Sequence, residues 1–419
     1  MSHLFLEQNE PQPDRAILIA LDTGEYDAQT SLDELAELTK SAGAEVAGTL
    51  LQRRDAPDAA TCVGRGFLAE AALYVQNLQA QLVIFDRELT GSQTSNIESA
   101  LDCRVIDRTT LILDIFAQRA RSAEGRLQVE LAQQKYRLPR LTGKGTELSR
   151  LGGGIGTRGP GETRLEADRR HIRRRIAALE KQLEEVRRRR ALIRGRRKHT
   201  GVPTVAIVGY TNVGKSTLLN ALTDAGVLAE DQLFATLDPT ARALRLPDGR
   251  TVMLVDTVGL VRRLPHPLVD AFRSTLEEAS EADLILNVCD VSSLDAEEQC
   301  RVSRELLSEL GAGNTPVLTV LNKCDRLSGA PPLAAGGVCL VSAKTGFGLD
   351  TLLQETAKRL EPIHTRLRLL LPYSQGALLG EVRGTGQIFS EEYLAEGVLI
   401  DALVDRRLFA RCSSFIFEG

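Results

Sequence analysis

The 419-residue chain contains no apolar run that approaches the roughly 20 residues needed to cross a membrane. Residues 1–7 lack the basic flank and the long apolar stretch of a secretory signal. The chain also carries no lipidation signal and no amphipathic membrane face. These absences argue against stable membrane insertion, and they predict a cytoplasmic protein.

Paired cysteines are absent as well. The seven cysteines are scattered, odd in number, and never spaced as CxxC. We therefore predict reduced structural thiols, which are usual in a reducing compartment.

What is present begins with an uneven charge distribution. The net charge of −4 conceals fifteen Lys and Arg against five Asp and Glu in residues 164–198, so the rest of the chain carries −14. An acidic protein with one concentrated basic element predicts a polyanionic partner, either nucleic acid or the ribosome. A solvated helix face is the alternative interpretation.

The length predicts several domains, because one compact core rarely exceeds 250–300 residues. Residues 1–120 form the first unit: short apolar runs at 16–20, 45–49 and 82–85 alternate with helical stretches at 31–42 and 66–77, which favours an α/β domain with a parallel sheet. Asp22 and Asp86 follow two of these runs. Isolated acids at strand ends are commonly turn formers, and we assign them no role.

Residues 121–200 have a helical pattern. A helix over 125–138 is expected to end at Pro139, and a loop over 142–163 holds eight glycines. A long helix follows, with apolar residues spaced by fours and threes. They are Ile172, Ile176, Leu179, Leu183, Val186 and Ile193, and the facing stripe is Leu127, Leu131 and Leu138. This predicts an antiparallel helical hairpin with a glycine-rich tip.

Residues 201–362 form a third unit, with strands at 204–208, 284–289 and 317–321, a helix at 216–225, and a hairpin over 242–256 that turns at Asp248 and Gly249. Residues 363–419 suggest a small α+β domain, with strands at 366–371 and 398–402 around a helix at 374–382. The predicted fold class is therefore α/β multidomain.

A phosphate-binding loop opens the third unit. It comprises Gly209, Tyr210, Thr211, Asn212, Val213, Gly214, Lys215, Ser216 and Thr217. A strand precedes it and a helix follows, so its backbone N–H groups would surround phosphates at a helix N-terminus. Lys215 would reach the β- and γ-phosphates, and the Ser216 hydroxyl would bind Mg²⁺.

Two segments are candidates for switches that sense the γ-phosphate. Switch I is Phe234, Ala235, Thr236, Leu237 and Asp238, and switch II is Asp256, Thr257, Val258 and Gly259. Asp256 ends a predicted strand and would hold Mg²⁺, while the Gly259 N–H would meet the γ-phosphate. Thr236 would complete the Mg²⁺ shell. Thr240 competes for this role, although Pro239 restrains the backbone just before it.

The base-reading residues are Asn322, Lys323 and Asp325, followed by Ser342, Ala343 and Lys344. The Asp325 carboxylate would accept from guanine N1–H and the exocyclic amine, a pair of donors that adenine lacks. Asn322 and Lys323 would support this loop and pack on the base, and the Ser342–Lys344 backbone would meet guanine O6. All the motifs together predict that residues 201–362 are a Ras-like P-loop G domain, in a protein that binds GTP and GDP and hydrolyses GTP.

The glycine-rich segment 152–163, the basic helix, the P-loop and residues 234–240 together resemble the HflX family of GTPases across essentially the whole chain. The resemblance implies a cytoplasmic GTPase that uses Mg²⁺, engages the large (50S) ribosomal subunit and its rRNA, and splits stalled ribosomes under stress. We also expect a monomer. An RNA-binding ribosome-assembly factor whose GTPase times its release is the alternative. The candidate RNA contacts are Arg158, Arg187, Arg188, Arg189 and Arg190.

One catalytic residue is missing. Leu260 follows Gly259 where Ras-like enzymes carry a glutamine that orients the attacking water, so intrinsic hydrolysis should be slow. The ribosome, a rearranged switch or a bound cation could stimulate it. Asn212 resembles the asparagine of K⁺-stimulated GTPases, although an ordinary P-loop residue explains it equally well. Arg262 and Arg263 are either charge stabilisers or plain surface arginines.

Overall fold

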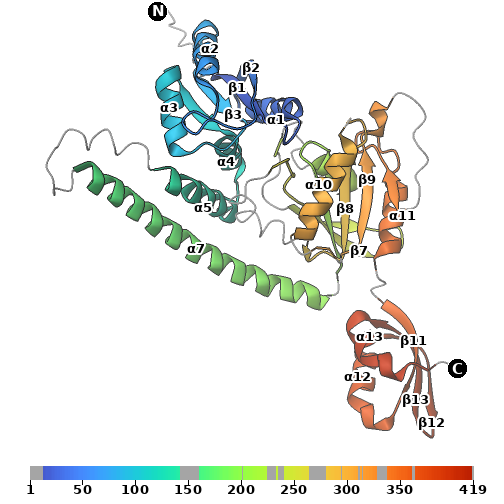
Figure 1. The fold of residues 1–419 in the computed structure, drawn as a ribbon. Helices are drawn as coiled ribbons and strands as arrows, with labels where there is room; N and C mark the ends of the chain where they lie inside the picture. Colours follow the sequence, from blue (N-terminus) through green and yellow to red (C-terminus); the bar gives the residue numbers. More distant parts are fainter. Residues whose placement is uncertain are drawn as a thin grey trace, which may run out of the picture.

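A computed structural model describes residues 13–141, 160–200, 202–223, 233–234, 240–263, 280–293, 295–309, 312–313, 315–327, 337–360 and 364–417. An α/β domain, a helical hairpin, a second α/β domain and a small α+β domain follow one another along the chain (Figure 1). This arrangement confirms the predicted fold class.

The first domain is a parallel four-stranded sheet in the order β2-β1-β3-β4. The strands are β1 (Arg15–Asp22), β2 (Glu45–Arg53), β3 (Leu82–Phe85) and β4 (Arg104–Asp107), and the helices are α1 (Ala28–Ser41), α2 (Arg65–Asn77), α3 (Gly91–Leu101) and α4 (Arg108–Arg119). Alternate residues of β1 point to opposite faces, so Leu18 packs with α1 and α4 while Ile19 packs with α2 and α3. The sheet is therefore covered on both faces.

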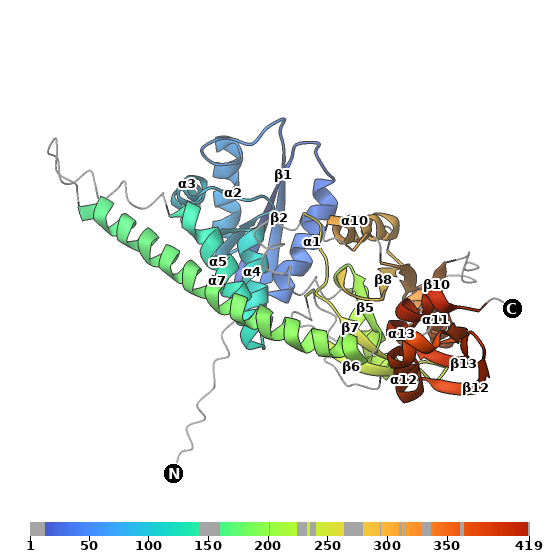
Figure 2. The ribbon, with the colours of Figure 1, turned by 90° about the horizontal axis from the view of Figure 1, so that it is seen from below.

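The hairpin consists of α5 (Ala123–Arg140) and the long helix α7 (Pro160–Thr200), which lie side by side in both ribbon views (Figures 1 and 2). Part of the predicted seam is present, because Leu131, Leu179 and Leu183 are buried together. The Arg175 guanidinium also donates two hydrogen bonds, of 2.6 and 2.7 Å, to the Glu130 carboxylate.

Two predicted boundaries of the hairpin were wrong. Helix α5 continues one residue beyond Pro139, where a contact with the first domain holds its last turn: the Arg140 side chain donates to Leu89 O at 3.0 Å. Helix α7 begins at Pro160, where the fixed φ of proline suits a first helical position, so the last four residues of the predicted loop are helical. The rest of the glycine-rich tip, including Arg158, lies outside the described residues.

The second α/β domain has a six-stranded sheet in the order β10-β9-β8-β5-β7-β6, in which β6 alone is antiparallel to its neighbour. The strands are β5 (Thr204–Gly209), β6 (Thr240–Arg245), β7 (Thr251–Asp256), β8 (Leu284–Asp290), β9 (Val317–Asn322) and β10 (Val338–Leu340), and the described helices include α8 (Lys215–Thr223), α10 (Ala296–Glu309) and α11 (Leu349–Arg359). The carboxyl ends of the five parallel strands therefore share one edge, where ligands bind in such folds.

The expectation that all cysteines are reduced was wrong for one pair. Cys289 lies near the end of β8 and Cys300 on α10, and the two form a disulfide with their Cα atoms 6.1 Å apart. The chain returns over β8 within 11 residues, which brings the two side chains together. Spacing in the sequence gave no sign of this contact.

The last domain is an antiparallel sheet in the order β11-β13-β12, with its own hydrophobic core. Its elements are β11 (His364–Leu371), α12 (Gly376–Thr385), β12 (Gln387–Leu394), β13 (Gly397–Asp405) and α13 (Arg406–Cys412). The polar composition of β12 explains why the sequence did not predict this strand.

The first domain packs directly on the second. Phe116 of α4 and Phe234 have their ring centroids 4.4 Å apart, and the Leu233 N–H donates to Ser41 Oγ at 3.1 Å. A single buried apolar cluster therefore spans both domains. In the part of the chain that the structure describes, no helix is long and apolar enough to cross a membrane.

Candidate nucleotide-binding site

The P-loop joins the central strand β5 to α8, and two of its residues need a left-handed backbone. Gly214 has φ +90°, and a Cβ there would lie 2.5 Å from Asn322 Nδ2. Asn212 has φ +59°, a conformation that asparagine tolerates better than most residues. The loop thus turns tightly enough for its N–H groups to converge on an anion at the start of α8.

Lys215 lies inside this loop. Its Nζ donates to the carbonyl oxygens of Gly209 at 3.1 Å and Tyr210 at 2.7 Å, and the residue is 7% exposed. Burial lowers the pKa of the Lys215 ammonium to about 8. A bound phosphate would favour the charged form further, because its negative charge would add to that of the nearby Asp256, which already raises this pKa against the effect of burial.

A second pair of groups has the chemistry of a hard-cation site. Asp256 ends β7 with no exposed surface, and Ser216 Oγ donates to Asp256 Oδ2 at 2.8 Å. Carboxylate and hydroxyl oxygens are the ligands that Mg²⁺ prefers. Thr240 lies directly opposite Asp256 in the β6–β7 ladder. Thr236, with the other switch I residues 235–238, lies outside the described residues, so the choice between the two threonines stays a prediction.

The start of switch II is bound to the P-loop. A Cβ on Gly259 would lie 2.7 Å from Thr211 Cγ2, so only glycine fits this approach. The Leu260 N–H donates to Gly209 O at 3.1 Å, and Leu260 O accepts from the Thr211 N–H at 2.8 Å. The Leu260 side chain is 2% exposed and apolar, so it cannot orient an attacking water.

Asn322, at the end of β9, joins two loops that the base would contact. Its Nδ2 donates to Val213 O at 2.8 Å, and its Oδ1 accepts from the Ala343 N–H at 3.0 Å. Lys323 Nζ donates to Asn212 O at 2.6 Å and pairs with Asp290 at 2.8 Å. Asn322 therefore fixes the distance between the P-loop and Ala343, and Lys323 ties the P-loop to the end of β8.

Asp325 lies in the short helix η1 (Cys324–Arg326), where its side chain is exposed. The hydroxyl of the buried Ser342 donates to Asp325 Oδ1 at 2.6 Å, and this bond is the main cause that lowers the pKa of the Asp325 carboxyl. The carboxylate is thus ionised and oriented, as a reader of guanine N1–H must be. Lys344 is exposed beside it.

The structure therefore brings the predicted P-loop, switch II and base-reading residues together at one sheet edge. The RNA candidates lie apart from this edge: Arg187, Arg188 and Arg189 are exposed on α7, and the Arg190 side chain lies outside the described residues. Within the described ranges, no group of three or more His, Cys, Asp or Glu is arranged to hold a metal ion.

Several contacts of the site were not anticipated. Tyr210 Oη donates to Glu34 of the first domain at 2.7 Å and accepts from the Arg262 N–H at 2.5 Å. Asp86, interpreted above as a turn former, is buried and paired with Arg108 and Arg263. The interpretation failed because the partners of Asp86 come from distant parts of the chain. Asp22 does accept from the Gly24 N–H within its own turn.

Three family models match the chain in succession. They describe a GTP-binding GTPase N-terminal region over residues 29–117, a GTP-binding GTPase middle region over 119–197 and a 50S ribosome-binding GTPase over 204–323. A curated relative named GTPase HflX, from Caldanaerobacter subterraneus subsp. tengcongensis, is 51% identical to this chain over 99% of this chain and 96% of the relative. Another GTPase HflX, from Escherichia coli K12, is 43% identical over 87% of each chain. A GTP-binding protein from Sulfolobus solfataricus, solved with GDP, is 26% identical with a TM-score of 0.45, over 83% of this chain and 98% of its own.

Proposed function

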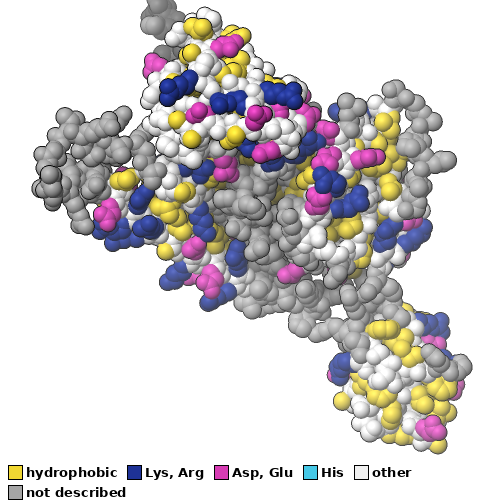
Figure 3. Space-filling view, in the orientation of Figure 1, with side chains coloured by type: hydrophobic (Ala, Val, Ile, Leu, Met, Phe, Trp, Pro, Cys, Tyr) yellow, Lys and Arg dark blue, Asp and Glu magenta, His cyan; other side chains and the backbone are white. Residues whose placement is uncertain are grey.

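The chain belongs to the HflX family of GTPases and hydrolyses GTP, and we propose that it does so to act on the large ribosomal subunit. The observation that carries the ribosomal part is the row of exposed arginines on α7, a long helix that extends beyond its partner α5 (Figure 1). Lys and Arg side chains gather along the lower left of the surface, where α7 runs in Figure 1 (Figure 3). The match to a model described as a 50S ribosome-binding GTPase supports the same partner.

The nucleotide would bind across the sheet edge described above. P-loop residues 209–217 would hold the phosphates, with Lys215 moving from the loop carbonyls to the β- and γ-phosphates. Ser216 and either Thr236 or Thr240 would hold Mg²⁺, and Asp256, which accepts from the Ser216 hydroxyl, would hold the ion directly or through water. When bound, Mg²⁺ neutralises charge that develops on the phosphates. Asp325 would select guanine, and Asn322 would keep the base loops in place.

Stimulation of hydrolysis has to come from outside the Leu260 position, because that side chain is buried and apolar. We propose that contact with the ribosome supplies it. GTP turnover should therefore rise on addition of purified large subunits, and an unchanged rate would remove this part of the proposal. Asn212 remains the candidate ligand for a stimulating K⁺.

The arginines of α7 provide a direct test. Replacing Arg187, Arg188 and Arg189 with glutamine should weaken large-subunit binding and flatten its log–log salt dependence by about one unit per lost phosphate contact. Nucleotide affinity should not change. A matched control removes the same charge from exposed positions of the second α/β domain, Arg242, Arg304 and Lys358. If the salt dependence of large-subunit affinity has the same slope in the two triple variants, the α7 arginines form only a solvated helix face and do not contact phosphates.

Ribosome splitting and assembly are separated by a second experiment. A splitting factor should dissociate intact 70S ribosomes, with the glycine-rich tip of the hairpin reaching into the subunit. An assembly factor that uses GTP to time its release should bind large subunits without dissociating 70S particles. Subunit dissociation measured with GTP and with a non-hydrolysable analogue therefore distinguishes the two.

A further inference from the structure

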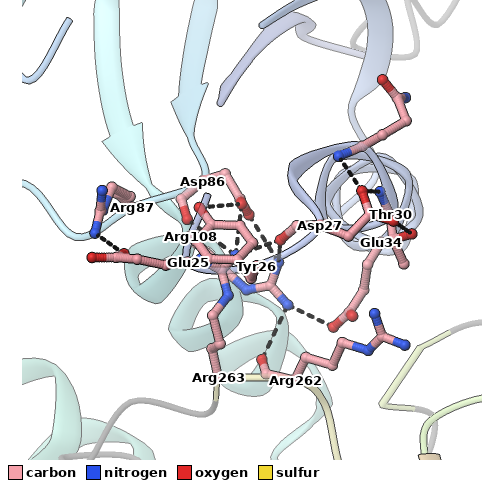
Figure 4. Close-up of polar contacts among 12 residues, drawn as sticks. Glu25, Tyr26, Asp27, Thr30, Glu34, Asp86, Arg87, Arg108, Arg262 and Arg263 are labelled. Carbon is pink, nitrogen blue, oxygen red and sulfur yellow. Dashed lines mark hydrogen bonds and ion pairs between the residues drawn. The ribbon is translucent and has the colours of Figure 1, made fainter. Parts of the chain in front are cut away.

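The sheet of the first domain has a ligand-binding position of its own. The strand order β2-β1-β3-β4 changes direction between β1 and β3, and parallel sheets bind ligands outside the carboxyl ends of such a pair. Tyr26, Glu34, Asp86 and Arg108 surround this point (Figure 4), together with Ser31, whose hydroxyl accepts from Arg108 at 3.4 Å. We refer to these five residues as the switch-point crevice. Asp86 follows β3 and has no exposed side-chain surface.

The crevice is occupied by Arg263, four residues after Gly259. Its Nη2 donates to Asp86 Oδ2 at 2.6 Å and also contacts Ser31 Oγ, and its guanidinium lies 3.8 Å from the centre of the Tyr26 ring. An anion, a hydroxyl and an aromatic face are the groups that recognise a guanidinium. The chemistry of the crevice therefore matches its occupant.

The backbone also indicates that Arg263 is held in place. Its φ of +51° lies in the left-handed region, which a residue with a side chain rarely adopts unless its surroundings require it. The contacts of the guanidinium provide that requirement. Arg262, the preceding residue, instead pairs with Asp295 of the second α/β domain at 3.2 Å.

Arg108 connects the crevice to the P-loop. This guanidinium is 3% exposed; it pairs with Asp86 at 2.9 Å and Glu34 at 2.5 Å and donates to Arg262 O at 3.2 Å. Glu34 in turn accepts the hydrogen bond from Tyr210. Two carboxylates and two guanidiniums thus balance each other, and loss of Arg263 would leave a buried excess of negative charge.

We propose that the switch-point crevice is a guanidinium-binding site whose ligand is Arg263, and that its occupancy is thermodynamically coupled to the nucleotide bound beside Gly259. Gly259 and Arg263 belong to one short segment, and a γ-phosphate that engages the Gly259 N–H changes the position of that segment. Because both sites act on this one segment, occupancy of the crevice must change nucleotide affinity by the same factor by which the nucleotide changes the affinity of the crevice for Arg263. This inference needs the GTPase activity and does not depend on the ribosomal role proposed above.

The test compares the affinities of the full chain for GDP and for a non-hydrolysable GTP analogue. Arg263→Ala should change the ratio of the two affinities by about fivefold or more, the usual lower range of allosteric coupling. Arg262→Ala removes the same charge from the same segment and should leave the ratio unchanged, because its partner Asp295 lies outside the crevice. An unchanged ratio in Arg263→Ala would overturn the proposal.

Two further variants distinguish coupling from a loss of folding. Arg263→Gly relieves the left-handed backbone, removes the side chain and leaves Asp86 paired with Arg108. In the wild type, hydrogen exchange of the amides in α1 and after β3 should differ between the GDP-bound and analogue-bound forms, and Arg263→Gly should abolish that difference. Arg263→Lys keeps the positive charge but lacks the planar guanidinium with its several N–H donors, so it should show part of the nucleotide-dependent difference in hydrogen exchange. A nucleotide-dependent difference that persists in Arg263→Gly would contradict the coupling.

Discussion

The two α/β domains bind groups of opposite charge at equivalent edges of their sheets. Both have parallel strands whose carboxyl ends carry the polar groups. In the second domain these groups are backbone N–H donors, the Lys215 ammonium and the Ser216 hydroxyl, which suit phosphates. In the first domain they are the Asp86 carboxylate after β3 and the Glu34 carboxylate of α1, which pair with the guanidiniums of Arg263 and Arg108. The architecture thus provides a binding position, and the groups that the loops and helix starts add beside the strand ends determine the class of ligand.

The largest effect should come from changing the residue that recognises the guanine base at the nucleotide-binding edge of the second α/β domain. Asp325→Asn replaces an acceptor with a donor opposite guanine N1–H, so we expect GTP affinity to fall about a thousandfold and preference to shift toward xanthine nucleotides. Competition between GTP and XTP for the same pocket measures both changes. Equal discrimination in variant and wild type would mean that another residue selects the base.

An intermediate effect should come from Tyr210, which joins the two edges. Tyr210→Phe leaves Glu34 and the Arg262 N–H without this hydroxyl, and we expect it to cost about 1–3 kcal/mol of stability and to lower nucleotide affinity severalfold. Tyr136→Phe is the matched control, because the buried Tyr136 hydroxyl of α5 also donates to a carboxylate, that of Asp107 in the first domain. Denaturant unfolding and GDP binding should separate the two: both variants lose stability, and only Tyr210→Phe loses affinity.

The sequence predicted one edge and not the other for a physical reason. The phosphate and guanine groups lie in short segments with fixed spacing, because a strand, a tight loop and a helix place each of them by local geometry. Asp86, Arg108 and Arg263 meet only after two domains have packed, and no local pattern records that contact. The polarity of Asp86 at a strand end was visible, but its burial depends on the tertiary structure. The same holds for Cys289 and Cys300.

The end of α5 was also mispredicted because it depends on a tertiary contact that no local sequence pattern records. Pro139 was expected to stop α5, but the helix includes it, and Arg140 at its end donates to Leu89 O at 3.0 Å in the first domain. Tertiary contacts of this kind outweigh the local preference of proline near a helix end. Part of the apolar seam of the hairpin was predictable, because heptad-like spacing places Leu131, Leu179 and Leu183 on the faces that meet.

The smallest effect should come from Ser342, which adjusts the nucleotide edge without contacting the sheet of the first domain. Its hydroxyl orients Asp325 and lowers the pKa of that carboxyl below the ordinary 3.8, so the carboxylate stays ionised to lower pH than an unassisted aspartate. Ser342→Ala should return the pKa toward 3.8. At pH 7 both forms are ionised, and we expect GDP affinity to fall only about three- to tenfold through lost orientation. As the pH falls through about 4, the variant should lose affinity before the wild type. GDP titrations at the two pH values measure this difference, and parallel pH profiles would show that Ser342 has no effect on the ionisation of Asp325.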